Sequence, residues 1–192
     1  MNLHIFVVDM DQAAVASVDI PRRDFKGVYR HFYPPEGVDA WRIRHFRELK
    51  NKKKEVKDKY LCEFRQKLEE AKKKFDIDIK YYPQPSAKFW NRVYYALKNY
   101  DEVILDKNLY HNYKHKLGIE SAQVDVILDG DITEKIKELT NKIENEKKKR
   151  YPNYKLIEDY ERDLWLWRGR WVLVMIADNY LAYKRRSPKC TN

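Results

Sequence analysis

Residues 101–106 read DEVILD, and residues 124–129 read VDVILD. Each run is a short apolar segment of the kind that forms a buried strand. A helical pattern follows each of them, near 109–117 after the first, where Gly118 is expected to end it, and from Thr133 after the second. Strands that alternate with helices indicate parallel strands joined by crossover connections. The two runs therefore predict the parallel part of an α/β sheet.

The first 34 residues predict strands of a different kind. Residues 4–9 form a nearly continuous apolar run, residues 14–20 form a second, and residues 27–33 alternate in character before Pro34-Pro35 stops them. Three short runs so close together predict an antiparallel meander, and residues 76–82 are a further candidate strand. The expected fold is α/β, a mixed five-stranded sheet with three antiparallel strands, then two parallel strands, and flanking helices. One such domain accounts for residues 1–192.

Long helices are expected between and after the strands. Residues 39–75 contain neither Pro nor Gly, and their apolar residues recur three or four apart, which predicts one long basic amphipathic helix or two in tandem, capped by Asp39. Ser86 is expected to cap a helix that runs through Leu97. The last helix is expected over 154–186, buried where it is apolar all round, with a strand over 171–176 as the alternative.

Composition limits the classes of partner. The chain has 40 Lys and Arg against 30 Asp and Glu, a formal net charge of +10, which favours polyanionic partners such as nucleic acid. No apolar run reaches membrane-spanning length, so no membrane partner and a cytoplasmic location are expected. Cys62 and Cys190 are far apart, which indicates neither a zinc site nor a disulfide framework and favours a reducing compartment. The abundance of Lys, Glu and Tyr is typical of thermophiles.

Aspartates at strand ends are the main functional signal. Asp9 ends the first run, Asp106 ends the run at 101–106, and Asp129 and Asp131 follow the run at 124–129. Ligand groups in α/β sheets gather beyond the carboxyl ends of the strands. Carboxylates that converge there repel one another unless a cation lies between them, and their hard oxygens suit Mg²⁺ or Mn²⁺. Each acid alone has an ordinary explanation as a turn or capping residue.

Asp178 adds to this set because it lies in an otherwise apolar helical stretch, VMIADNYLAY at 174–183. An acid on a buried helix needs a partner or a metal, and an ion pair with Arg or Lys is the simplest alternative. Asp11 lies two residues after Asp9 and joins the metal-ligand candidates. The expected ligand set is Asp9, Asp11, Asp106, Asp129, Asp131 and Asp178.

This order of elements and acids resembles the RNase H-like (retroviral integrase-like) superfamily. The acid on the first strand matches Asp9 in VVDMD, the acid after the fourth strand matches Asp106 in VILD, and the acid of the last helix matches Asp178. That helix looks like the one in the RuvC-type resolvase branch. The resemblance implies that these three acids are catalytic and bind two Mg²⁺ ions that cleave a phosphodiester. It also implies a homodimer, for which the long basic helix is the candidate interface.

Three departures accompany the resemblance. Met10-Asp11-Gln12 replaces the usual Gly or Ser close behind the first-strand acid, and the first helix is unusually long and rich in lysine. The segment 76–97 lies where the family often continues almost directly to the fourth strand. The function expected from the sequence is a metal-dependent nuclease or related phosphodiester-processing enzyme, with DNA preferred over RNA as its partner. The expected nucleic-acid-binding residues are Lys52, Lys53, Lys54, Lys107, Arg185 and Arg186, with the basic run at 147–150 as a further candidate.

Two other functions remain open from the sequence. A nucleotide-sugar transferase of the GT-A type binds a metal diphosphate through an Asp-X-Asp motif, which Asp9-Met10-Asp11 or Asp129-Gly130-Asp131 provides. A basic nucleic-acid-binding protein without catalysis would use the lysine runs, with exposed aromatic residues stacking on bases.

Overall fold

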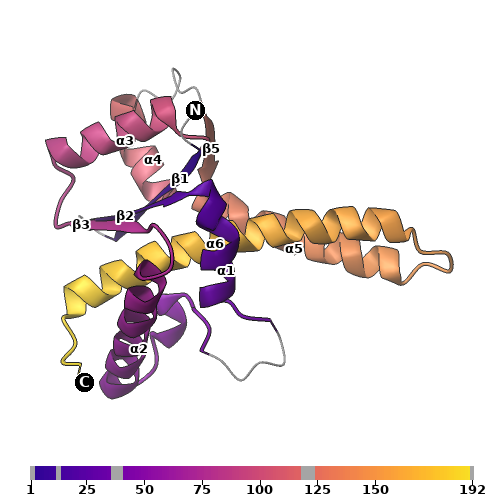
Figure 1. Ribbon diagram of the computed structural model, residues 1–192, viewed down its shortest axis with the longest axis horizontal. Helices are drawn as coiled ribbons and strands as arrows, with labels where there is room; N and C mark the ends of the chain where they lie inside the picture. Colours follow the sequence, from indigo (N-terminus) through magenta and orange to yellow (C-terminus); the bar gives the residue numbers. More distant parts are fainter. Residues whose placement is uncertain (1–2, 12–13, 36–40, 118–123, 191–192) are drawn as a thin grey trace.

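The computed structural model describes residues 3–11, 14–35, 41–117 and 124–190. Its sheet has the order β3-β2-β1-β4-β5 (Figure 1). The strands are β1 (His4–Asp11), β2 (Ala14–Pro21), β3 (Asp78–Tyr82), β4 (Glu102–Leu105) and β5 (Asp125–Leu128). β2 pairs antiparallel with both β1 and β3, whereas β4 pairs parallel with both β1 and β5. The predicted α/β class and mixed five-stranded sheet are confirmed.

The third antiparallel strand was predicted in the wrong place. Residues 27–33 belong mostly to the helix α1 (Phe25–Phe32), and the third strand is the candidate at 76–82, observed as β3. Phe25, Val28 and Phe32 are buried at helical spacing, and this face decides the conformation. Gly27 allows close packing, because a Cβ there would lie 2.4 Å from Cε1 of Phe75.

The long helix predicted over 39–75 is wrong in its first half. Residues 46–49 form the short 3₁₀ helix η2 (Phe46–Leu49), and the α-helix α2 covers Lys54–Lys72. Contacts from elsewhere in the chain hold this stretch out of a helix: Phe32 O accepts the Ile43 N–H, and the hydroxyl of Tyr60 accepts the Arg44 N–H. Asp39, the predicted cap, and Gly118, the predicted end of the helix after β4, lie outside the described residues.

Helices cover both faces of the sheet (Figure 1). On one face lie α3 (Ala87–Asn99) and α4 (Lys107–Leu117), which pack on Phe6 and Val8 of β1. Ser86 caps α3 as predicted, since its hydroxyl accepts the Phe89 N–H. The opposite face packs on α1, α2 and α6 (Tyr154–Arg186), and α6 is helical over 171–176. α6 therefore forms the centre of the second layer, directly under β1.

A helical hairpin projects from this body (Figure 1). It is made by α5 (Asp129–Lys147) and the first half of α6, which share an apolar seam of Leu139, Ile143, Ile157 and Leu164. α5 begins at Asp129, directly after β5, and so starts four residues before the predicted position. Within the described ranges, no helix combines the length and hydropathy that a membrane crossing requires.

The two cysteines are joined, contrary to the expectation from their spacing. A disulfide links Cys62 of α2 to Cys190 of the tail after α6, across 128 positions of sequence. Sequence separation alone could not reveal the pair, because tertiary packing between α2 and the end of α6 brings the two cysteines together. The disulfide also removes the argument for a reducing compartment, because disulfides persist mainly in oxidising ones or in hyperthermophiles.

Candidate metal site at the sheet edge

Three aspartates occupy equivalent positions on the three parallel strands. Val8 of β1 pairs with Leu105 of β4, and Leu105 pairs with Leu128 of β5. The next residue in each case is an aspartate: Asp9, Asp106 or Asp129. Parallel strands are about 4.8 Å apart. The shared register alone therefore brings these three acids into one row at the carboxyl edge of the sheet.

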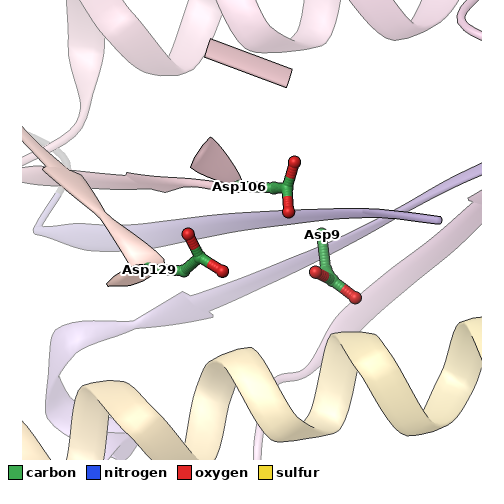
Figure 2. Close-up of side chains that lie close together, drawn as sticks. All are labelled: Asp9, Asp106 and Asp129. Carbon is green, nitrogen blue, oxygen red and sulfur yellow. The ribbon is translucent and has the colours of Figure 1, made fainter. Parts of the chain in front are cut away.

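The alternation of side chains directs the three acids to the α6 face of the sheet. Ile104 of β4 and Ile127 of β5 pack in the core on that face, as Val7 of β1 does. Asp9, Asp106 and Asp129 lie two residues further along and continue the alternation. Figure 2 shows the three carboxylates close together, with Asp9 directed toward the helix in the colour of the C-terminal residues.

The three carboxylates are close enough to share a cation. One oxygen from each of Asp9, Asp106 and Asp129 lies within 4.8 Å of the others. Asp9 is 9% exposed and Asp106 is 5% exposed. Burial raises the pKa of Asp9 well above its usual range, and the charges of Asp178, Asp106 and Asp129 raise it further. The pKa of Asp9 therefore depends on the charges of the three other acids, Asp178, Asp106 and Asp129.

Asp106 and Asp129 are held in place by backbone donors. Oδ1 of Asp106 accepts the Leu109 N–H at 2.7 Å, and Oδ1 of Asp129 accepts the Lys107 and Gly130 N–H groups at 2.9 and 2.8 Å. Burial raises the pKa of Asp106 to about 6, and the charge of Asp129 adds to this shift, whereas the N–H groups of Leu109 and Asn108 and the charge of Arg47 oppose it. The capping role expected for a strand-end aspartate is therefore real, but it coexists with the clustering of the three acids.

The acids lie in the wall of a cavity of about 920 Å³. Asp9, Asp106 and Asp129 line it from the sheet, and Asp178 lines it from α6. Basic residues also line it: His45, Arg47 and Lys50 from the segment around η2, and Arg185 and Arg186 from the end of α6. The cavity therefore combines a carboxylate floor with a cationic rim, which suits a metal ion bound together with a phosphate.

Asp178 has a position of its own in this cavity. Its Oδ2 accepts the Phe46 N–H at 2.9 Å and lies 3.1 Å from Nδ1 of His45. Asp178 thus has a histidine and a backbone donor as partners, where Arg or Lys was the expected alternative to a metal. Its main visible effect is to hold the η2 segment against α6, with its charge close enough to raise the pKa of Asp9.

The other predicted acidic ligands lie further out. Asp11 lines the cavity but is largely exposed and forms an ion pair with Arg185. Asp131, in the first turn of α5, is exposed and is absent from the cavity wall. Asp129-Gly130-Asp131 therefore presents one carboxylate to the cavity, which is less than an Asp-X-Asp metal motif requires.

The predicted nucleic-acid-binding residues fall into two groups. Arg185 and Arg186 line the cavity, where Arg186 also pairs with Asp58 at 3.1 Å. Lys52, Lys53 and Lys54 are exposed at the start of α2 and do not line the cavity. Lys107 is exposed at the start of α4. Its contact with the site is the main-chain N–H, which donates to Asp129, rather than the side-chain ammonium.

The sequence did not point to the η2 segment as part of the site. His45, Arg47 and Lys50 line the cavity from a stretch that the sequence pattern assigns to the long helix. The only local signal is the pair of basic residues, Arg44 and Arg47, around His45. Their place in the cavity depends on the contact with Asp178, which is 132 positions away in sequence.

Comparison with known proteins identifies no relative from which a function could be inferred. No protein-family model, no curated protein and no solved structure matches the chain. The chemistry of the site is therefore inferred from its own side chains, and the family resemblance remains an expectation.

Proposed function

We propose that this chain is a metal-dependent nuclease, or a related phosphodiester-processing enzyme, that acts on nucleic acid through Asp9, Asp106 and Asp129. The observation that carries the proposal is that oxygens of these three acids lie within 4.8 Å of one another on adjacent parallel strands. A divalent cation offsets the repulsion of such a cluster, and oxygen ligands of this kind suit Mg²⁺ or Mn²⁺.

The charges around the cluster favour a phosphodiester substrate. Metal ions bound by carboxylates neutralise a phosphate oxygen and generate a nucleophile from water. The chain's own contribution is the cationic rim of Arg47, Lys50, Arg185 and Arg186, which favours the negatively charged strand on either side of the reacting phosphate. The net charge of +10 favours the same partner at longer range.

Asp9 is the acid best suited to contact two ions. The charges of Asp178, Asp106 and Asp129 all raise its pKa, so all three acids lie near it. In two-metal sites the ions are about 4 Å apart, so one carboxylate commonly contacts both. Asp178 then acts as an auxiliary ligand or as the anchor of the η2 segment.

The topology supports the resemblance to the RNase H-like superfamily as part of this proposal. β1 and β4 are adjacent parallel strands that end near Asp9 and Asp106, the two strand acids that the resemblance matches to catalytic ones, and this adjacency supports the proposal. Asp178 on α6 lines the same cavity. The resemblance does not include Asp129, which we add to the proposed site because its carboxylate lies close to those of Asp9 and Asp106.

Cleavage assays test the proposal directly. Single-stranded, double-stranded and branched DNA and an RNA–DNA hybrid are incubated with the protein and Mg²⁺ or Mn²⁺, with EDTA as the blank. We expect metal-dependent cleavage that Asp106→Asn abolishes and Asp131→Asn retains, because Asp131 lies outside the cavity. Intact binding without cleavage of any substrate supports a binding protein instead, and Mn²⁺-dependent binding of a nucleotide sugar supports a transferase.

A further inference from the structure

The tip of the α5–α6 hairpin has an unusual surface. Residues 147–155 read KKKRYPNYK, with five basic residues and no acidic one. Tyr151 is 80% exposed and Tyr154 is 73% exposed, more than any other large hydrophobic residue described. Exposed aromatic side chains add nothing to a core, so two of them within a basic run indicate a binding surface.

The basic residues of the tip are only partly used within the fold. Lys147 pairs with Glu161, and Lys149 pairs with Glu146. The ion pairs of the described residues do not include Lys148, Arg150 or Lys155. The guanidinium of Arg150 lies 5.5 Å from the ring centre of Tyr151, so charge and aromatic face are presented together.

Hydrogen bonds brace the turn at the tip. Glu146 is buried and accepts the Asn153 N–H at 3.0 Å, while Oδ1 of Asn153 accepts the Leu156 N–H and so begins α6. The hydrogen bonds from Lys149 and from the Asn153 N–H hold the pKa of Glu146 below its usual range. The turn therefore presents Tyr151 and Tyr154 on a braced support, which lowers the entropy lost on binding.

We propose that this hairpin tip, comprising Lys148, Arg150, Tyr151, Tyr154 and Lys155, is a second binding surface for nucleic acid, remote from the carboxylate cluster. Tyrosine faces stack on unpaired bases of any sequence, and the flanking cations contact phosphates. The inference rests on the proposed function only for the class of ligand, since binding at the tip needs neither metal nor cleavage.

The helix α5 connects the carboxylate cluster to the hairpin tip. α5 begins at Asp129 and ends at Lys147, a span of 19 residues. At about 1.5 Å per residue, the tip lies about 27 Å from the cluster. At about 3.4 Å per nucleotide step, this distance corresponds to roughly eight stacked nucleotides of one strand. A strand that reaches both sites is therefore longer than a dinucleotide product or a free nucleotide.

An anionic membrane surface is the main competitor for a basic aromatic tip. Membrane-binding segments bury Trp, Phe or Leu beneath a basic face. The tip offers none of these: between Lys147 and Lys155 its uncharged residues are Tyr151, Pro152, Asn153 and Tyr154. Tyrosines with a neighbouring asparagine are better suited to bases and phosphates than to the interior of a lipid layer.

Binding measured in EDTA tests the tip separately from catalysis. The full chain is titrated into fluorescein-labelled single strands of about 20 nucleotides, long enough to reach both sites, and fluorescence anisotropy is recorded. We expect Tyr151→Ala/Tyr154→Ala to weaken binding about fivefold or more, while Tyr151→Phe/Tyr154→Phe retains it, because stacking needs only the ring. Lys148→Ala/Arg150→Ala removes two cations that contact phosphates. A plot of the logarithm of the binding constant against the logarithm of the salt concentration should therefore become shallower, its slope changing by about 1.5.

A matched control is available on α3. Tyr95 is 51% exposed and Lys98 is also exposed, so Tyr95→Ala/Lys98→Ala removes the same chemistry from another face and should bind as the parent does. Tip variants that bind like this control overturn the inference. So does tip-dependent capture by phosphatidylserine vesicles with unchanged binding of the oligonucleotide. Tip-dependent binding without any Mn²⁺-dependent cleavage removes the proposed nuclease function and leaves the tip assignment standing.

Discussion

Asp9 and Asp106 lie side by side at the ends of two adjacent parallel strands, each one position beyond the paired residues Val8 and Leu105. The Asp106 N–H donates to Val8 O at 2.9 Å, so the backbone pairing of β1 and β4 continues up to the two acids. Main-chain hydrogen bonds therefore fix the separation of the two backbones at these acids, so both side chains start from neighbouring positions on the sheet. The core of the fold thus holds two mutually repelling groups together.

Replacing Asp106 by Asn should separate the chemistry of the site from its stability. The amide keeps an oxygen that can accept the Leu109 N–H but removes a charge that a metal needs. We expect metal-dependent cleavage to fall by at least about 100-fold, the equivalent of about 2.7 kcal/mol of lost transition-state stabilisation. The melting temperature of the metal-free protein at pH 7 should rise, because repulsion of Asp9 is relieved.

Asp131→Asn is the control for this substitution. Asp131 is exposed in the first turn of α5 and lies outside the cavity, so cleavage and metal-dependent melting should stay at the parent level. Equal losses of activity in both variants would show that general charge, rather than the cluster, supports the reaction.

Stability should depend on pH in a direction set by Asp9 and Asp106. Both pKa values are raised in the folded protein, that of Asp106 from 3.8 to about 6. The folded state therefore holds these protons more tightly than the unfolded state, and the resulting stabilisation is complete below the unfolded pKa. It is lost as pH rises from 3.8 through about 6.

Metal binding should show the opposite dependence, since the ion competes with protons for the same oxygens. We expect the increase in melting temperature caused by Mg²⁺ or Mn²⁺ to be small near pH 5 and to grow through the pKa of Asp106, about 6. Differential scanning fluorimetry at matched ionic strength measures this increase. An increase that is independent of pH, or that Asp106→Asn retains, would place the bound metal elsewhere.

The sheet and its row of acids were largely predictable because both depend on local patterns. Short apolar runs that end in aspartate identify Asp9 and Asp106, and parallel pairing follows from the intervening helices. Asp129 was among the predicted ligands but not among the predicted catalytic acids. Its importance depends on the register between β4 and β5, which no single segment encodes.

The errors arise where contacts distant in sequence override a local pattern. The run at 27–33 has both an alternating and a helical reading, and burial of Phe25, Val28 and Phe32 selects the helix. The segment around η2 has helical spacing but is held by Asp178 and Tyr60. The Cys62–Cys190 pair likewise depends on packing between α2 and α6.

Asp178 should behave differently from the strand acids when it is substituted. Its Oδ2 already accepts the Phe46 N–H, and an asparagine oxygen can replace that bond. We therefore expect Asp178→Asn to reduce cleavage less than Asp106→Asn does. Asp178→Ala should be more harmful, because the loss of an acceptor for a part-buried N–H costs about 1–3 kcal/mol and releases the segment that carries His45 and Arg47.

Proteolysis and kinetics distinguish these roles. Limited digestion near residues 44–50 should accelerate in Asp178→Ala and remain slow in Asp178→Asn, since only the alanine removes the acceptor. If Asp178→Asn lowers cleavage as far as Asp106→Asn does, with digestion unchanged, Asp178 is a full metal ligand, as the sequence resemblance implies.

Reduction of the disulfide should destabilise the chain through its unfolded state. The bond joins Cys62 and Cys190 across 128 positions, and closing a loop of that size lowers the entropy of the unfolded chain. The chain-entropy model gives about 5 kcal/mol for such a loop, which corresponds to a fall in melting temperature on the order of 10 °C for a chain of this length. Scanning fluorimetry with and without a reductant measures it.

The double variant Cys62→Ser/Cys190→Ser is the control. It should melt at the temperature of the reduced parent, and the reductant should leave its melting temperature unchanged. Cleavage should survive in both forms at temperatures below melting, since Cys190 lies beyond α6 and neither cysteine lines the cavity. A reductant that lowers cleavage while the protein stays folded would instead mean that the tail controls the nearby end of α6, where Arg185 and Arg186 form part of the rim.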